Sequence, residues 1–460
     1  MVPPLDLSNP CRIHVVGVGG SGMSAIAGVL LAMGHHVSGS DTSDSPVLSR
    51  LAAAGASVRV GHAPEAIGAA DLVAVSTAIP ADDPEVLEAS RAGIPVLRRA
   101  EVLAAICATR PTLAVSGTHG KTTTTAMLAM ALRGAARRPS FIVGGDIVGL
   151  GTGAAWDEGE WFVVEADESD GTFVELPRHG VIVTNVEADH LDHWGSFEAL
   201  RDAFDEFVAG ADGPRVVCAD DEGARALARR VPGCVTYGTA DDADARMTDL
   251  ETGRDRVAFA FDGRAVTLQV PGVHNARNAA GVLTLGRELG VDVDAMIEAL
   301  GSFEGVGRRY ERRGAAGGIT FVDSYDHLPT EVAAVLAAAK DGGWRRIVCV
   351  FQPHRYTRTA ALWRSFADAF VDADRLAVTE IYAAGQAPID GVSGKLIVDA
   401  VLDAHPRSEV AWLPERESLA RWLRATLRPG DLCLTLGAGD LTTLPSELLA
   451  ALGSGDGASS

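Results

Sequence analysis

A segment rich in glycine and threonine carries residue types that bind phosphate. It reads Ser116-Gly117-Thr118-His119-Gly120-Lys121-Thr122-Thr123 and joins an apolar run, 112–116, to a helical stretch. Backbone N–H groups of such a loop surround nucleotide phosphates, the lysine adds a positive charge, and the first threonine hydroxyl can bind Mg²⁺. The strict G-x-x-x-x-G-K-[ST] pattern needs glycine at 115, where valine stands, yet the shortened form still predicts a nucleoside-triphosphate site. Its members are Gly117, Thr118, His119, Gly120, Lys121, Thr122 and Thr123.

Two acidic clusters follow the next predicted strands, at 165–170 and 187–192. The carboxyl ends of parallel strands meet at one edge of a sheet, so both clusters should lie beside the phosphate loop. Because Mg²⁺ prefers oxygen ligands and few protein groups, we predict a metal site at Thr122, Glu165 and His190. Helix caps or solvated loop charges explain the remaining acids equally well.

A glycine pattern near the N-terminus predicts a second nucleotide site. Gly17-Val18-Gly19-Gly20-Ser21-Gly22 follows an apolar strand and opens a helix, and Asp41 follows the next strand. The glycines allow close backbone approach, a helix N-terminus favours phosphate, and the acid can accept from a ribose hydroxyl. NAD or another nucleotide diphosphate fits this pattern, and so does tight strand–helix packing with no ligand.

Polar residues crowd several further positions. His274-Asn275-Ala276-Arg277-Asn278 precedes a helix, where the asparagines suit either an adenine edge or helix capping. Gly307-Arg308-Arg309-Tyr310 can place a guanidinium on phosphate or form an exposed basic turn. The strand ends 321–331 and 351–358 hold histidine, arginine and tyrosine, which packing alone does not explain. They predict a site for a small substrate that bears a carboxylate.

Length and composition indicate a folded protein of several domains. The 460 residues correspond to about three domains, and 47% apolar residues suffice for several cores. The net charge of −21 argues against general binding to nucleic acid or anionic membranes. No apolar run reaches the roughly 18 residues of a membrane span, and the six scattered cysteines are typical of reduced thiols. We expect a cytoplasmic protein with no membrane insertion and no nucleic-acid partner.

Strand and helix signals alternate along the chain, which predicts the α/β class with mainly parallel sheets. The first domain, 1–110, has expected strands at 13–18, 36–40, 57–60, 71–76 and 95–97. The central domain, 111–314, has expected strands at 112–116, 161–165, 181–184 and 216–219 and ends in two helices. The last domain, 315–452, has expected strands at 319–322, 346–351, 375–379, 409–413 and 431–436. The glycine-rich stretch 314–318 is expected to be a hinge, and 453–460 a disordered tail.

These motifs, in this order, resemble the Mur ligase family over nearly the whole chain. The resemblance also includes the segments 38–41, 76–80, 323–332, 351–358 and 379–385. It implies a Rossmann-like N-terminal domain that binds a UDP-sugar, a P-loop ATPase-like central domain, and a Rossmann-like C-terminal domain that binds an amino acid. Within the family the chain looks most like the alanine-adding member, an ATP- and Mg²⁺-dependent enzyme, monomeric or homodimeric, that joins L-alanine to the carboxylate of UDP-N-acetylmuramate.

The resemblance implies a role for each matching residue. The UDP-sugar site would comprise Gly19, Gly20, Asp41, His62, Ser76 and Thr77. Besides the phosphate loop, ATP would contact Asn275, Asn278, Arg308 and Asp323. The amino acid would lie among Tyr325, His327, His354 and Arg355. The catalytic residues would be Lys121, Glu165, His190, Arg308, His327 and His354, with either of the last two histidines as the base.

Two residues depart from the family pattern D-D-Y-[AG]-H-H-P. The chain reads Asp323-Ser324-Tyr325-Asp326-His327-Leu328-Pro329, so Asp326 adds a charge and Leu328 removes a donor beside the expected amino-acid site. These two changes bear on substrate selectivity and rate.

The implied reaction belongs to peptidoglycan precursor synthesis. The carboxylate takes the γ-phosphoryl group of ATP, and a neutral amine then attacks the acyl phosphate, releasing ADP and phosphate. Closure of the last domain about 314–318 would exclude water.

Three alternatives stay open. A ligase that recycles a whole tripeptide onto the same UDP-sugar shares the early motifs, although the segment 351–358 favours the alanine-adding type. An NAD(P)-dependent oxidoreductase would leave the phosphate loop unused. A catalytically silent nucleotide-binding regulator would suit Asp326 and Leu328 but not the intact loop.

Overall fold

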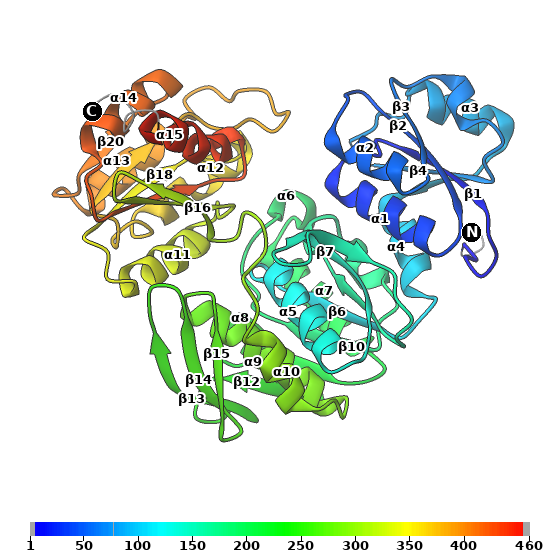
Figure 1. The fold of residues 1–460 in the computed structure, drawn as a ribbon, viewed down its shortest axis with the longest axis horizontal. Coiled ribbons are helices and arrows are strands. Elements are labelled where there is room, and N and C mark those ends of the chain that lie inside the picture. Colours follow the sequence, from blue (N-terminus) through cyan, green and yellow to red (C-terminus); the bar gives the residue numbers. More distant parts are fainter. Residues whose placement is uncertain (1–4, 77, 454–460) are drawn as a thin grey trace. The chain divides into compact units, whose positions relative to one another are not determined.

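The computed structural model describes residues 5–76 and 78–453, and these form three sheets with helices (Figure 1). They fall into two compact units. The first holds the described residues up to Thr248, with Ala260–Val266 and Arg277–Phe303, and the second holds Asp249–Phe259, Thr267–Ala276 and the described residues from Glu304 onward. The predicted α/β class with three sheet-containing domains is confirmed. None of the described helices combines the length and apolarity needed to cross a membrane.

The N-terminal sheet is parallel throughout, in the order β3-β2-β1-β4-β5. Its strands lie close to the predicted positions: β1 (Arg12–Val16), β2 (His36–Asp41), β3 (Ser57–Val60), β4 (Leu72–Val75) and β5 (Val96–Arg98). The helices are α1 (Ser21–Ala32), α2 (Pro46–Ala53), α3 (Pro84–Ala92) and α4 (Arg99–Cys107), with a 3₁₀ turn at Pro64–Ile67. Side chains of Ser45 and Asp83 cap α2 and α3, and proline follows each cap. Since the strands are parallel, the predicted UDP-sugar residues follow strands that end at one edge.

The second sheet has ten strands, in the order β15-β14-β13-β12-β11-β10-β6-β9-β7-β8. The four predicted strands are present as β6 (Thr112–Ser116), β9 (Phe162–Glu165), β10 (Gly180–Val183) and β11 (Arg215–Cys218). Six further strands lie outside the predicted set: β7 (Ser140–Ile147), β8 (Thr152–Ala155), β12 (Cys234–Gly238), β13 (Ala245–Thr252), β14 (Val257–Phe261) and β15 (Arg264–Leu268).

Strand β6 is buried along its length between β10 and β9, so the phosphate loop opens from the middle of the sheet. The helices of this region are α5 (Lys121–Gly134), α6 (Leu191–Trp194), α7 (Phe197–Ala209), α8 (Glu222–Arg230), α9 (Val273–Glu288) and α10 (Val293–Leu300). Two 3₁₀ turns, Glu168–Asp170 and Thr172–Glu175, follow β9.

The third sheet lies in the second unit, in the order β16-β17-β21-β18-β19-β20. Its strands are β16 (Glu311–Ala316), β17 (Ile319–Ser324), β18 (Arg346–Phe351), β19 (Arg375–Val378), β20 (Val410–Trp412) and β21 (Asp431–Leu436), and only β16 is antiparallel to its neighbour. The helices are α11 (Pro329–Asp341), α12 (Tyr356–Leu362), α13 (Lys395–Ala404), α14 (Arg416–Thr426) and α15 (Leu444–Gly453), with 3₁₀ turns at Trp363–Phe366 and Asp440–Thr443. Alternate residues of the central strands face separate apolar cores: Phe351 packs with Phe366 and Phe370, and Phe321 with Leu419 and Leu444.

The glycine-rich stretch 314–318 is not a hinge, which corrects the sequence interpretation. Gly314 lies in β16 at an irregularity in its pairing with β17, and Gly317 and Gly318 form the turn between the two strands with φ values of 58° and 75°. Both strands belong to the second unit. The domain limit expected at 314 therefore falls inside β16, and the limits as a whole stay a prediction. Of the expected tail, 454–460 lies outside the described residues.

An ion pair between the buried Asp431 and the partly exposed Arg346 joins the first residues of β18 and β21. Arg346 donates to both carboxylate oxygens of Asp431, at 3.0 and 2.6 Å, and Asp431 is fully buried. Asp431→Asn keeps the shape but leaves the guanidinium without its counter-charge, so we expect a loss of about 1–3 kcal/mol in the free energy of unfolding. The matched control is Asp399→Asn in the exposed Lys395–Asp399 pair, where the loss should stay below about 0.5 kcal/mol. Urea unfolding checks both values, and equal losses would contradict the role of burial.

Candidate nucleotide and substrate sites

The phosphate loop is held by the residues that follow β10. The N–H of Thr118 donates to the carbonyl of Asn185 at 3.2 Å, and the N–H of His119 donates to the Asn185 side chain at 2.7 Å. Gly117 has a φ of +133°, and a Cβ there would lie 2.1 Å from the Thr184 hydroxyl. Glycine is therefore required at 117 by both the backbone conformation and the close approach of the next strand end.

Lys121 is tied down at the first turn of α5. Its Nζ donates to the carbonyls of Gly117 and Thr118, at 2.8 and 3.3 Å, and to both oxygens of Glu168, at 2.9 and 2.8 Å. Burial raises the pKa of Glu168 to about 7 even though Lys121 opposes this, and the acids around Lys121 raise the pKa of the lysine despite its burial. The sequence left Glu168 open between an acid of the site and a cap or loop charge. Glu168 is only 1% exposed, and it positions the ammonium group of Lys121.

Thr122 and Glu165 meet as the metal prediction requires. The Thr122 hydroxyl donates to Glu165 Oε1 at 3.1 Å, and the N–H of Gly144 donates to Oε2 at 3.0 Å. A hydroxyl and a carboxylate are the oxygen donors that Mg²⁺ prefers, so these residues fit that ion. A Cβ at Gly144 would lie 2.6 Å from Glu165, so the glycine leaves room for this carboxylate.

His190 is placed by an unusual backbone conformation. It has a φ of 51° and precedes α6, and its Nε2 lies 3.3 Å from Asp189 Oδ2. Burial raises the pKa of Asp167, but Lys121, Ser169 and His190 outweigh it, so the pKa lies below its ordinary value. His190 is thus close enough to Asp167 to affect its pKa, and its role as a metal ligand stays a prediction.

The two asparagines of the 274–278 segment have different surroundings. Asn275, in the first turn of α9, donates from its side chain to the carbonyl of Pro271 at 2.7 Å, a contact with the loop before the helix and not a cap of the helix N–H groups. Asn278 lies beside the phosphate loop, because a Cβ at Gly120 would be 3.0 Å from its side-chain oxygen. Both are 7% exposed, and their contact with adenine stays a prediction.

The glycine motif of the N-terminal sheet is closed by Asp41. The N–H of Gly19 donates to Asp41 Oδ2 at 2.9 Å, and the N–H of Gly20 donates to the carbonyl of Gly17 at 3.2 Å. Ser76, after β4, lies next to this turn, since a Cβ at Gly17 would be 3.4 Å from its own Cβ. The structure therefore brings four predicted UDP-sugar residues together, while Thr77 lies outside the described residues.

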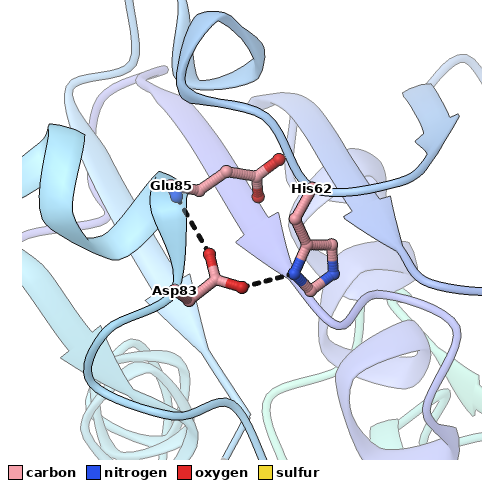
Figure 2. Close-up of side chains that lie close together, drawn as sticks. All are labelled: His62, Asp83 and Glu85. Carbon is pink, nitrogen blue, oxygen red and sulfur yellow. Dashed lines mark hydrogen bonds and ion pairs between the residues drawn. The ribbon is translucent and has the colours of Figure 1, made fainter.

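His62 belongs to a buried network (Figure 2). Its Nδ1 lies 2.5 Å from Asp83 Oδ2, and the N–H of Glu85 donates to Asp83 Oδ1 at 2.9 Å. Glu85 also accepts from Ser40 at 2.5 Å and from the N–H of Ala63 at 2.9 Å.

These three side chains have the residue types and spacing of a metal site. Their oxygens, however, are already used by protein donors, which indicates a structural network. Burial raises the pKa of Glu85, but bonds from His14, Ser40 and Ala63 outweigh it and lower the pKa below its ordinary value. His62 Nε2 is buried, with no hydrogen-bond partner within the described part of the chain. The place of His62 in a UDP-sugar site therefore stays a prediction.

A cavity of about 640 Å³ lies in the first unit. Ser21 and Gly22 at the start of α1 line it, together with Arg99, Gly144 and Glu165. The N-terminal end of α1, which follows the glycine motif, and Glu165 therefore line the same cavity.

Arg308 and Asp323 each form hydrogen bonds with other residues of the second unit. Arg308 Nη2 donates to the carbonyls of Gly437 and Gly439, at 3.2 and 3.3 Å. Asp323 is 1% exposed and accepts from the hydroxyls of Thr435 and Thr442, at 2.7 and 2.6 Å. Arg308 has a φ of 61°, a strained conformation for a residue with a side chain. Their contacts with ATP stay a prediction.

The predicted amino-acid residues converge at the ends of β17 and β18. The ring of His327 lies 5.5 Å from that of Tyr325 and 5.4 Å from that of His354. Tyr382 contacts the segment that follows β18. Its N–H donates to the carbonyl of Pro353, its carbonyl accepts from the N–H of Arg355, and its ring stacks on that of His354 with the ring centres 6.0 Å apart. Sequence reasoning missed Tyr382 as a site residue, although it lies in the 379–385 motif.

Both histidines are neutral near pH 7. Burial lowers the pKa of His327 to about 4 and that of His354 to about 3, and for His354 the neighbouring His327 and Arg358 lower it further. Arg358 was not among the predicted residues, although it stands in the same 351–358 motif; its Nη1 lies 2.9 Å from His354 Nδ1.

The two departures from the family pattern are buried. Asp326 accepts a hydrogen bond from Ser324, and burial raises the pKa of Asp326 to about 6, with Glu331 adding to the rise. Leu328 is 5% exposed and precedes α11, where the Glu331 side chain accepts from its N–H at 3.1 Å. Asp326 is therefore satisfied inside the protein, and Leu328 serves packing.

The loop geometry makes a stability prediction. Gly117→Ala should destabilise the first unit by about 2–4 kcal/mol, because the new Cβ meets Thr184 and the backbone conformation is unfavourable for alanine. Gly149→Ala is the control: it also has positive φ, at +87°, but its Cβ would meet nothing within 4 Å, so the cost should be about 1 kcal/mol. Denaturant titration of both variants measures the difference, and a Gly117 variant no less stable than the Gly149 variant would refute the close contact.

Comparison with known families gives three consecutive matches. They are "Mur ligase family, catalytic domain" over residues 12–111, "Mur ligase middle domain" over 115–286, and "Mur ligase, glutamate ligase domain" over 308–439. Together they include the glycine motif, the phosphate loop and the strand ends of the third sheet.

Individual relatives extend over almost the full chain. The UDP-N-acetylmuramate–L-alanine ligase of Anaeromyxobacter dehalogenans is 46% identical over 97% of this chain and 98% of its own length. That of Rubrobacter xylanophilus is 44% identical over 96% of this chain and 100% of its own. The crystal structure of UDP-N-acetylmuramate-alanine ligase from Thermotoga maritima has a TM-score of 0.81 and 29% identity, covering 97% of this chain and 100% of that one. With both its motifs and its full length matched in this way, the chain belongs to the Mur ligase family.

Proposed function

We propose that this protein is the ATP-dependent ligase that joins L-alanine to the carboxylate of UDP-N-acetylmuramate in peptidoglycan synthesis. The observation that carries the proposal is the Thr122–Glu165 pair, 3.1 Å apart at the end of a phosphate loop, with Glu165 on the wall of the cavity that begins at α1. The relatives that bear this activity in their names, at 44–46% identity, support the choice of substrates.

The first step forms an acyl phosphate. A carboxylate oxygen of the UDP-sugar attacks the γ-phosphorus of ATP, the bond to the β-phosphate oxygen breaks, and ADP leaves. Lys121 and the N–H groups of 117–120 would hold the phosphates, and Thr122, Glu165 and His190 would hold Mg²⁺. When bound, that ion neutralises charge on the phosphoryl oxygens. Glu168 keeps the lysine in place through its two hydrogen bonds.

The second step forms the amide. The amine of L-alanine attacks the acyl carbon, the carbon–oxygen bond to phosphate breaks, and inorganic phosphate leaves. Tyr325, His327, His354 and Arg355 of the second unit would surround the amino acid, and one histidine would take the amine proton. Arg308 and Asp323 would contact ATP, as would Asn275 and Asn278.

The remaining assignments rest on the family resemblance. The UDP-sugar would contact Gly19, Gly20, Asp41, His62, Ser76 and Thr77. We propose three domains, at 1–110, 111–314 and 315–452, with the second limit moved ahead of β16 so that its pairing with β17 stays within one domain. We also propose a cytoplasmic location, with the protein a monomer or homodimer.

The second candidate is the ligase that recycles a tripeptide onto the same UDP-sugar. A murein peptide ligase from Psychrobacter arcticus shares the fold, with a TM-score of 0.69 at 24% identity. The observation that favours this second candidate is that Asp326 and Leu328, both buried, depart from the pattern of the alanine-adding ligases.

Phosphate release tests the proposal. Purified protein with ATP, Mg²⁺ and UDP-N-acetylmuramate should release phosphate when L-alanine is added, and much less with glycine, L-serine or a tripeptide. Lys121→Ala should lower the rate at least about 100-fold, because charge on the transferred phosphoryl group loses its partner. Lys340→Ala, at an exposed lysine on α11, is the control and should leave the rate unchanged. Release only with the tripeptide would select the second candidate, and release with none would refute both.

A further inference from the structure

His327 and His354, the two histidines of the expected amino-acid site, differ in the partner of their Nδ1 atom. The difference matters because a neutral imidazole has one nitrogen that donates and one that accepts. A partner that can only accept, or only donate, therefore determines which nitrogen carries the hydrogen. The inference that follows rests on the proposed function, since it concerns the second step of that reaction.

His327 Nδ1 faces oxygen atoms. It lies 3.1 Å from the carbonyl oxygen of Tyr325 and 3.6 Å from Glu331 Oε2. A carbonyl can only accept, so Nδ1 carries the hydrogen and Nε2 keeps its lone pair. A protonated His327 would keep the carbonyl as acceptor and would have the Glu331 carboxylate beside it.

His354 Nδ1 faces a cation instead. It lies 2.9 Å from Nη1 of Arg358. A guanidinium has donors and no acceptor, so Nδ1 must hold the lone pair, and the hydrogen of the neutral ring is on Nε2. Protonation of Nδ1 would place two donors against each other. Burial lowers the pKa of His354, and the nearby His327, Arg358 and Arg355 lower it further.

We infer that His327 is the base of the amide-forming step and that His354 is a hydrogen-bond donor which does not accept the proton. The amine attacks the acyl carbon, and the adduct nitrogen then gives a proton to His327 Nε2. The carbon–oxygen bond breaks, phosphate leaves, and His327 returns its proton to phosphate or solvent. His354 donates from Nε2 to an oxygen of the substrate, such as the carboxylate of the amino acid.

The surroundings of the rings support different roles. Burial lowers the pKa of His327, as do Arg358 and Arg309, while the Glu331 carboxylate and the Tyr325 carbonyl oppose this by favouring the imidazolium. Within the described residues, burial, His327, Arg358 and Arg355 all lower the pKa of His354, and none of these neighbours is an acid. The two rings meet edge to face, 5.4 Å apart, so both reach the same small region at the ends of β17 and β18.

A comparison of two nucleophiles tests the assignment. Hydroxylamine is neutral at pH 7 and traps acyl phosphates as hydroxamates with little need for a base, whereas L-alanine needs one. His327→Gln should lower kcat for alanine addition by about 10²–10⁴-fold while hydroxamate formation falls far less. His354→Gln, which keeps a donor near the former Nε2, should raise KM for L-alanine with kcat within about threefold. His405→Gln, at a half-exposed histidine of the same unit, is the control.

The outcomes separate the inference from the function. No hydroxamate with the unaltered enzyme would refute the acyl phosphate and thus the proposed function. Hydroxamate formation in all variants with the large kcat loss in the His354 variant would overturn the inference alone. Nitrogen-15 spectra of histidine-labelled protein give a readout independent of activity: hydrogen on Nδ1 of His327 and on Nε2 of His354 is expected, and the reverse pattern would overturn the assignment even if a variant failed to fold.

Discussion

The side chain of Lys121 carries a positive charge and is only 12% exposed. Burying an ammonium group without partners costs several kcal/mol of folding free energy. Three residues of the first unit accept hydrogen bonds from this ammonium group. Loop carbonyls of Gly117 and Thr118 accept from it, and Glu168 binds it with both oxygens. Trp194 of α6 in turn donates to the Glu168 carbonyl at 3.0 Å. The loop must turn tightly for its own carbonyls to reach Lys121. This tight turn explains why Gly117 packs so closely against Thr184.

Among the described residues, three of the nine non-glycine residues with positive φ are predicted site residues. His190, Arg308 and Arg355 have φ values of 51°, 61° and 67°, where residues with a side chain are uncommon. Each was predicted from its motif to contact a substrate, nucleotide or metal. Such conformations persist only where the surrounding contacts over-determine them, as the bonds of Arg355 to Tyr382 illustrate. The other six, such as Ala136 and Asp262, are not predicted site residues, so a positive φ by itself does not identify a site.

The sequence predicted the strands that carry the sites because long parallel strands are apolar and end in polar motifs. It could not predict strands such as β8, Thr152–Ala155, since a short antiparallel segment of small residues has no distinctive pattern. Gly314–Gly318 was misinterpreted because a hairpin turn and a hinge both need glycine. Glu168 and Asp83 were missed as positioning residues, because an acid after a strand has the same pattern whether it caps a helix or holds a buried cation.

The central claim is that the carboxylate of the UDP-sugar is activated as an acyl phosphate at the Lys121 loop. An isotope experiment tests it most directly: UDP-N-acetylmuramate labelled with oxygen-18 in both carboxylate oxygens is turned over with ATP and L-alanine, and the inorganic phosphate is analysed by mass spectrometry. The account predicts one labelled oxygen in each phosphate released. Unlabelled phosphate, formed at the same rate as the amide product, would contradict it.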